Sequence, residues 1–312
     1  MHAHQDAGGV RRIAYDTLGS TNAEALALAR AGEHGPLWVT ARRQTAGRGR
    51  RGNVWTSEPG NLFASLLLTD AVPAGRAPEL CFVAALALHD AVSSFLIPPP
   101  SGGGMKERLQ LKWPNDLLID EAKFAGILIE AESIQGKPPA VAIGIGVNCA
   151  HRPDDTSYPA TDLAACGAAV TPAALLAGLS RAMQARLEQW DFGAGFAATR
   201  ADWLARAAGL GGEIRVRLPG RELAGRFETL DRMGRLMLRL PAGTLEAITV
   251  GEVFAPAVNI PPLKGEGRTA EGSPGRGHSS NLPTPTRLAA LGDPGSSPGQ
   301  ALPLSGGGRS TE

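Results

Sequence analysis

Apolar positions along residues 11–209 recur with the spacings of both helices and strands, which predicts one large α+β domain. Short apolar runs predict strands at residues 13–16, 37–41, 62–68 and 141–148, with three more short strands between residues 111 and 130. Longer apolar segments predict helices at residues 23–30, 78–95 and 195–208, and another that begins at Thr171 and Pro172 and runs to about Trp190.

Residues 212–254 change to a regular alternation of apolar and polar positions between turns, which is typical of a small antiparallel barrel. Residues 261–312 contain 8 prolines and 11 glycines among 52 residues and no apolar periodicity, so we expect them to be disordered. The expected organisation is a flexible leader at 1–10, a large domain at 11–209, a barrel at 210–256 and a tail at 257–312.

The composition of the chain is that of an ordinary globular protein. Its 312 residues, 43% hydrophobic and 20% charged, can bury the core of a large domain and a small one. A net charge of +1 favours neither nucleic acid nor an acidic membrane as a partner. The three cysteines are far apart, which argues against a disulfide framework. The first residues are polar and no apolar run approaches the roughly 18 residues of a spanning helix, so we expect a cytoplasmic protein.

The densest cluster of candidate ligand-binding residues is at 44–52, Gln-Thr-Ala-Gly-Arg-Gly-Arg-Arg-Gly, and Trp55 follows it closely. Glycines let backbone amides approach a ligand, and arginines supply positive forks that match carboxylate and phosphate oxygens. The stretch therefore predicts an anion-binding loop. Its glycines also match the dinucleotide-binding pattern G-x-G-x-x-G, but such a turn must open a helix. Pro59 and Gly60 break the following segment before a strand, so the dinucleotide interpretation fails.

A second dense stretch begins at Lys112 and continues past Lys123. Asn115 and Asp116 alone are explained as turn formers, whereas Lys123 enters an apolar strand beside Phe124. Strict alternation places Gly126 nearer the side of Phe124, so the register around Lys123 stays open.

Glycines interrupt the strand at 141–148, which ends at Asn148. Because Gly144 and Gly146 weaken a buried strand, they imply the close approach of a ligand or of another backbone.

The start of the helix at 23–30 has two interpretations. Thr21 and Glu24 match the T-x-x-E capping box, so Ser20, Thr21 and Asn22 are explained as helix caps. Alternatively, the free amides and small polar side chains at this helix start bind the polar head of a ligand.

Taken together, these motifs resemble the biotin protein ligase family in order and spacing over about residues 11–254. The resemblance implies a mixed sheet flanked by helices, akin to class II aminoacyl-tRNA synthetases, followed by an SH3-like barrel. It is carried by residues 19–22 (Gly-Ser-Thr-Asn), 44–52, Trp55, 112–116 (Lys-Trp-Pro-Asn-Asp), Lys123, 125–128 (Ala-Gly-Ile-Leu) and 144–148 (Gly-Ile-Gly-Val-Asn).

The resemblance implies that biotin and ATP form biotinyl-5′-adenylate, from which a lysine of a carrier domain takes the biotinyl group. It assigns catalysis to Lys123, Arg48, Arg50 and Asp116, with Asp116 as a ligand of Mg²⁺. The implied biotin contacts are Ser20, Thr21, Asn22, Gln44, Arg48, Gly49, Arg50 and Lys123. The implied nucleotide contacts are Gly47, Arg50, Arg51, Trp55, Asn115 and Asn148.

The expected partner is the biotin carboxyl-carrier domain of a carboxylase, with no membrane and with a homodimer left open. About ten residues precede the first strand, so we expect no DNA-binding domain. No arginine in the barrel matches the one that some members use, which leaves a barrel contact to adenine open. The alternatives are a lipoate or octanoate ligase and a non-catalytic biotin-binding regulator.

Overall fold

The computed structural model describes residues 2–5 by their backbone and residues 9–69, 72–73, 75–96, 108–134, 138–156 and 158–254 in full. The tail expected at 257–312 lies outside these residues. Both sheets described below belong to one compact unit, Met1–Asn259.

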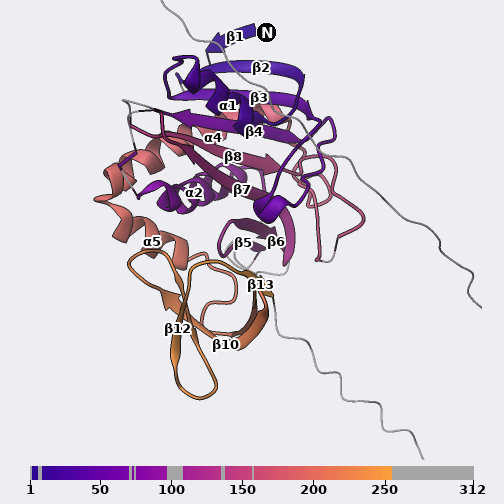
Figure 1. Cartoon of the computed structure of the whole chain (residues 1–312). Helices are drawn as coiled ribbons and strands as arrows, with labels where there is room; N and C mark the ends of the chain where they lie inside the picture. The colour runs from indigo at the N-terminus through magenta and orange to yellow at the C-terminus, as the bar shows by residue number, and fades with distance from the viewer. Residues whose placement is uncertain are drawn as a thin grey trace, which may run out of the picture. The chain divides into compact units, whose positions relative to one another are not determined.

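The main sheet has eight strands in the order β1-β2-β3-β4-β8-β7-β6-β5 (Figure 1). Only β2 and β3 pair in parallel, so the sheet is mixed, as the sequence predicts. The strands are β1 (His2–Gln5), β2 (Arg11–Leu18), β3 (Leu37–Gln44), β4 (Leu62–Leu68), β5 (Leu109–Lys112), β6 (Asp116–Ile119), β7 (Ala122–Glu132) and β8 (Ala140–Val147).

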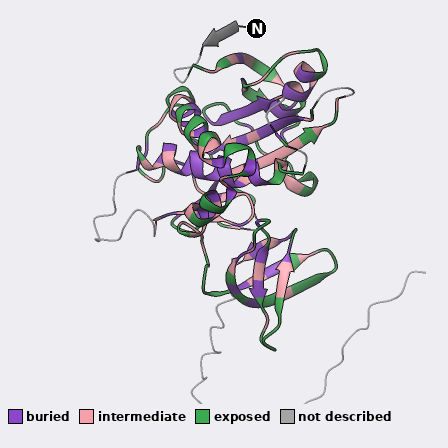
Figure 2. Ribbon diagram, turned by 90° about the vertical axis from the view of Figure 1, so that its left-hand side faces the viewer, coloured by how far each residue is buried: buried purple, intermediate pink, exposed green. Residues whose placement is uncertain are grey.

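Helices cover both faces of this sheet. Helix α1 (Thr21–Arg30) packs its apolar residues on one face, where Leu67 of β4 points. Helices α2 (Leu80–Ser93), α4 (Pro172–Trp190) and α5 (Phe196–Leu204) form the layer on the other face, where Leu66 points. Strand β4 is therefore buried along its whole length, and Figure 2 shows the buried residues concentrated in the sheet and the helix faces against it.

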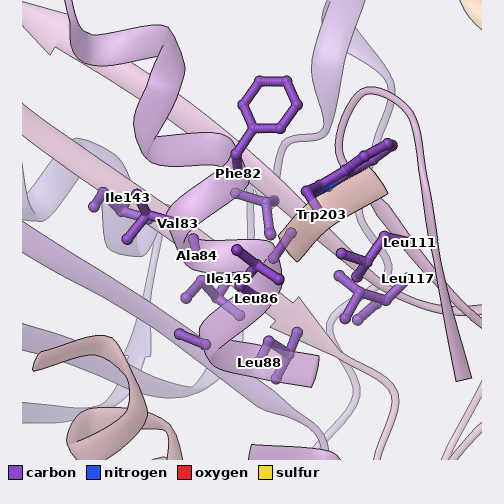
Figure 3. Packing of buried hydrophobic residues seen from close by; sticks show 14 of the residues in the cluster. Phe82, Val83, Ala84, Leu86, Leu88, Leu111, Leu117, Ile143, Ile145 and Trp203 are labelled. Carbon is purple, nitrogen blue, oxygen red and sulfur yellow. The ribbon is translucent and has the colours of Figure 1, made fainter. Parts of the chain in front are cut away.

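The core between α2 and the sheet is built from aliphatic and aromatic side chains (Figure 3). Phe82 of α2 meets the ring of Trp203 edge to face, with centroids 5.5 Å apart, and that of Phe196 at 5.6 Å. Such pairs add about 0.5–1.5 kcal/mol beyond their buried area, so they fix α5 against α2. Within the described residues, every helix is too short or too polar to cross a membrane.

The C-terminal sheet has five antiparallel strands in the order β12-β11-β10-β9-β13. The Nε1 of Trp113 donates to the carbonyl of Gly234 at 3.1 Å, which ties the turn after β10 to the main sheet. The strands are β9 (Glu213–Leu218), β10 (Arg221–Leu230), β11 (Leu236–Arg239), β12 (Leu245–Ile248) and β13 (Glu252–Phe254).

Three local expectations differ from the structure. Part of the expected leader, His2–Gln5, pairs with β2 as β1. The helix expected at 195–208 is only Phe196–Leu204. The capping box is absent, because Ser20 occupies the N-cap without a side-chain bond and the carboxylate of Glu24 accepts from the hydroxyl of Tyr15 instead.

An ion-pair network joins the three helices of the second layer. Arg186 of α4 donates to Asp90 of α2 at 2.7 Å and to Asp202 of α5 at 2.6 Å. Burial alone raises the pKa of Asp90, but hydrogen bonds from His89 and Arg186 outweigh it and hold that pKa below its usual value. The charged form of Asp90 is therefore favoured by folding.

We expect Asp90→Asn to lower the free energy of unfolding at pH 7 by about 1–2 kcal/mol, because the half-buried Arg186 loses a charged partner. A carboxylate with a lowered folded pKa stabilises above its unfolded pKa of about 3.9 and loses that effect as the pH falls through the folded pKa. The deficit should therefore shrink between pH 5 and pH 3 in urea titrations. Asp16→Asn, in an ion pair whose Asp16 side chain is 93% exposed, serves as the control and should change little.

Candidate functional site

A cavity of about 330 Å³ opens on the face of the main sheet that α1 covers. Its lining comes from the first turn of α1, the end of β3, the segment after it, the β5–β6 turn, β7, β8 and β13. Twelve of the fourteen residues selected from the sequence line it: Ser20, Thr21, Asn22, Gln44, Arg48, Gly49, Arg50, Arg51, Trp55, Asn115, Asp116 and Lys123.

Residues 47–55 form a small hairpin across the cavity, which we call the arginine hairpin. The amide of Gly49 donates to the carbonyl of Asn53 at 2.7 Å, and that of Trp55 donates to Gly47 at 3.0 Å. Its tip is one 3₁₀ turn, Arg50–Gly52, where Arg51 and Gly52 adopt positive φ angles of 57° and 78°. No helix follows, which confirms that the G-x-G-x-x-G match is not a dinucleotide-binding turn.

Each arginine of the hairpin contacts a different element. Arg48 pairs with Glu130 of β7 at 3.1 Å, and Arg51 lies 4.0 Å from Glu252 of β13. Arg50 donates to the Oδ1 of Asn115 in the β5–β6 turn at 3.2 Å, and burial lowers its pKa. The guanidinium groups are thus held apart around one cavity.

Lys123 and Asp116 form an ion pair inside the cavity, with Nζ and Oδ1 2.7 Å apart and both side chains 17% exposed. A β-bulge resolves the register that the sequence left open. Leu117 of β6 pairs with Ala125 and Leu118 pairs with Lys123, so Phe124 is an extra residue in β7. Lys123 and Gly126 consequently share the cavity face, while the side chain of Phe124 is buried on the other.

The polar residues at the start of α1 belong to a hydrogen-bond network. The amide of Thr21 donates to the Oε1 of Gln44 at 2.8 Å. The buried hydroxyl of Ser65 donates to the Oδ1 of Asn22 at 2.6 Å. The side-chain Nδ2 of Asn22 donates to the carboxylate of Glu130 at 2.8 Å, and Glu130 also accepts from Arg48. The network connects the helix start to the arginine hairpin and leaves the small polar groups at the cavity wall.

Glycines make room for the side chains that form this wall. A Cβ on Gly146 would lie 2.6 Å from the ring of Trp55, and one on Gly126 would lie 3.1 Å from it. A Cβ on Gly144 would lie 2.5 Å from Asn22. The close approach at Gly144 and Gly146 is present, but the approaching groups are side chains from other elements and not the ligand or backbone that the sequence predicts.

Two selected residues do not line the cavity. Gly47 lies at the base of the hairpin, where a Cβ would come within 2.6 Å of the Trp55 carbonyl. Asn148 is buried, and its side chain donates to the carbonyl of Thr161 at 3.1 Å. Both residues hold the elements of the site in place.

The cavity also has lining residues that sequence reasoning missed. Tyr158 comes from an irregular segment, and Glu252 and Phe254 come from β13, which no motif marks. Lys112 belongs to the Lys-Trp-Pro-Asn-Asp motif, although the motif by itself assigns it no role. Its ammonium lies 5.5 Å from the ring centroid of Phe254, and burial lowers its pKa.

The charges of the lining favour an anionic ligand. Five positive side chains line the cavity, against the carboxylates of Asp116 and Glu252. Among the described residues, no group of three or more histidine, cysteine or carboxylate side chains is placed to hold a metal by itself. The arrangement suits a polyanion such as a triphosphate beside a second, carboxylate-bearing ligand.

Comparisons with known proteins agree with this geometry. The sequence profile of the Biotin/lipoate A/B protein ligase family matches residues 18–148, and that of the Biotin protein ligase C terminal domain matches residues 209–255. A biotin–[acetyl-CoA-carboxylase] ligase of Paracoccus denitrificans is 44% identical over 244 residues, covering 75% of this chain and 96% of that protein. One from Mycobacterium tuberculosis is 34% identical over 243 residues, covering 75% of this chain and 85% of that protein.

A solved structure with the same fold is the biotin protein ligase from Aquifex aeolicus in complex with biotin and ATP. It superimposes with a TM-score of 0.64 at 24% identity, covering 78% of this chain and 97% of that chain. This likeness confirms the expected mixed sheet with flanking helices, and a small antiparallel sheet follows it where the SH3-like barrel is expected.

The packing of Trp55 on Gly146 is testable by fluorescence. Trp55 is the only one of the five tryptophans that is not buried, so iodide quenching reports mainly on it. We expect Gly146→Ala to push the ring outward and raise the quenching constant. Gly126→Ala, whose Cβ has more room, should raise it less. Unchanged quenching in a folded Gly146→Ala protein would show that the ring does not rest there.

Proposed function

The chain belongs to the biotin protein ligase family, and on that premise we propose that it activates biotin with ATP and transfers the biotinyl group to a carrier protein. Its activity is that of a biotin–[acetyl-CoA-carboxylase] ligase, the activity of the relatives from Paracoccus and Mycobacterium. The single observation that carries the residue assignment is the convergence of Arg48, Arg50 and Lys123 on one cavity.

In the first proposed step, a carboxylate oxygen of biotin attacks the α-phosphorus of ATP. The bond to the β-phosphate breaks, and pyrophosphate leaves. Two anions must approach each other, so Arg48, Arg50 and Lys123 lower the barrier by electrostatic stabilisation. In the second step, the amine of a carrier lysine attacks the acyl carbon, loses a proton, and AMP leaves. No protein nucleophile is required, because holding the reactants together supplies much of the acceleration.

The proposed biotin site is the polar end of the cavity, where Ser20, Thr21, Asn22 and Gln44 meet Gly49 of the arginine hairpin. The hydrogen bonds among these residues support this assignment. They hold the side chains at fixed positions, where their remaining donors and acceptors can bind a ligand. Apolar surface from Trp55 and the glycines of β7 and β8 lies beside it and suits the apolar parts of the substrates.

The proposed nucleotide site lies around Arg50, Arg51, Trp55 and Asn115, next to β13. Phe254 and Glu252 of the C-terminal sheet also line the cavity, which supports a contact between this sheet and adenine. We assign Gly47 and Asn148 an indirect part, since they support the hairpin and β7 without lining the cavity.

Mg²⁺ enters in this proposal with ATP as part of the substrate. Mg²⁺ usually keeps several waters and takes one or two protein carboxylates in addition to phosphates. The residues present fit that requirement, because Asp116 and Glu252 are the carboxylates of the lining. When bound, the ion neutralises phosphate charge. Asp116 is its proposed ligand. The ammonium of Lys123 lies 2.7 Å from the same carboxylate.

The proposed macromolecular partner is a carrier protein, and the net charge of +1 supports a protein rather than DNA. Three free cysteines support a reducing compartment such as the cytoplasm. A lipoate or octanoate ligase stays the alternative on the same fold, and a non-catalytic regulator is disfavoured because such a protein has no need of Arg50, Asp116 and Lys123 together.

Incubation of the purified chain with a biotin carboxyl-carrier domain, Mg·ATP and biotin tests the function directly. Mass spectrometry should find the carrier heavier by one biotinyl group. A parallel incubation with lipoate or octanoate should leave the carrier unchanged. Modification by lipoate or octanoate alone would reject the biotin assignment, and no modification by any of the three acids would reject ligase activity.

We expect Lys123→Ala to reduce biotin-dependent pyrophosphate release by about 100- to 1,000-fold, because one preorganised cation is lost from the transition state. Arg30→Ala is a matched control, since Arg30 pairs with Glu132 of the same strand at 2.6 Å but lies outside the cavity. The control should keep the wild-type rate. A wild-type rate in Lys123→Ala would remove Lys123 from the mechanism.

A further inference from the structure

A short segment after β8 clamps the backbone of Lys123. The amide of Lys123 donates to the carbonyl of Pro159 at 2.8 Å, and its carbonyl accepts from the amide of Thr161 at 2.9 Å. Lys123 and Ala160 thereby form a parallel bridge beside β7. Tyr158, two residues before Ala160, lines the cavity.

The segment is itself held by buried groups. Asn148 donates from its side chain to Thr161 at 3.1 Å and accepts from the amide of Leu163 at 2.9 Å. Asp162 is 5% exposed, pairs with Arg152 at 2.9 Å and accepts from a backbone amide at 2.8 Å. The segment that follows Tyr158 and bonds to the backbone of Lys123 is therefore itself anchored to buried groups.

The ammonium of Lys123 lies close to two aromatic rings. Its Nζ is 5.2 Å from the ring centroid of Tyr158 and 5.6 Å from a ring centroid of Trp55. Both distances fall within the roughly 6 Å at which a cation is attracted to a ring face. The third neighbour is the carboxylate of Asp116, 2.7 Å away.

The two kinds of partner affect the lysine differently. A carboxylate cancels the positive charge that an incoming anion needs, and Asp116 is also the proposed Mg²⁺ ligand. An aromatic face attracts the ammonium through its quadrupole while the net charge remains available. The side chain of lysine is a flexible chain of four carbons, so it needs a second restraint when its carboxylate partner binds another cation. The aromatic rings provide that restraint for Lys123.

We propose that Tyr158 is a positioning residue for the adenylation step. Its ring holds the Lys123 ammonium at the point where the acid group and the α-phosphate meet, and Trp55 provides a second aromatic contact. The hydroxyl of Tyr158 is not required. This inference rests on the proposed function, and it adds a residue that none of the recognised motifs contains.

The test compares Tyr158→Phe with Tyr158→Leu in biotin-dependent pyrophosphate release. We expect Tyr158→Phe to match the wild type, since it keeps the ring. Tyr158→Leu should lower kcat about 3- to 30-fold with a smaller change in KM for biotin, as expected for the loss of one cation–π contact. Tyr15→Leu, at the only other tyrosine of the chain and outside this cavity, should leave kcat unchanged.

A graded series guards against misfolding of the leucine variant. Phenylalanine carrying successively more fluorine atoms at position 158 keeps the shape of the ring while weakening its quadrupole. The rate should fall step by step with fluorination while the melting temperature stays constant. A purely structural role for Tyr158 predicts no such trend.

The outcomes separate this inference from the proposed function. An active wild type whose rate does not respond to Tyr158→Leu or to fluorination overturns the role of Tyr158 alone. A drop in Tyr158→Phe equal to that in Tyr158→Leu assigns the effect to the hydroxyl and also overturns it. A wild type that releases no pyrophosphate with biotin overturns the proposed function and this inference with it.

Discussion

The cavity depends on glycines in β7 and β8, because a glycine has no side chain to fill the space above the strand. Trp55 can lie across these strands only because Gly126 and Gly146 offer no Cβ beneath it, and Asn22 approaches β8 only because of Gly144. The packing of Trp55 on these glycines therefore fixes how close the arginine hairpin lies to the sheet. A buried strand with glycines is weaker than one without them, so part of its stability is given up to form the site.

The crowding of positive charge is the second constraint. Arg48, Arg50 and Arg51 repel one another on a short hairpin, yet each is held by a partner on a separate element. Most of these contacts are partly exposed and individually weak, so an incoming anion can replace them at modest cost. The site is thus preorganised for negative charge without being closed to it.

The C-terminal sheet completes the site and does not merely follow it in the chain. Its turn at Gly234 is bound to Trp113, next to the Pro-Asn-Asp turn that carries Asp116. Its last strand, β13, reaches the lining through Glu252 and Phe254. A displacement of this sheet would therefore shift Arg51 and Lys112, two cations of the cavity lining that contact it.

The sequence by itself determined the elements and most of the lining, because apolar periodicity and motif spacing are local properties that folding preserves. It indicated the buried strand β4, the start of α4 at Thr171 and twelve lining residues. Only the tertiary structure decided the face of Lys123, because a bulge at Phe124 breaks the alternation on which sequence reasoning relies. It also decided the place of Tyr158, Glu252 and Phe254, and it moved Asn148 from the lining to a supporting position. These outcomes depend on contacts between segments far apart in the chain, and no pattern within one segment records them.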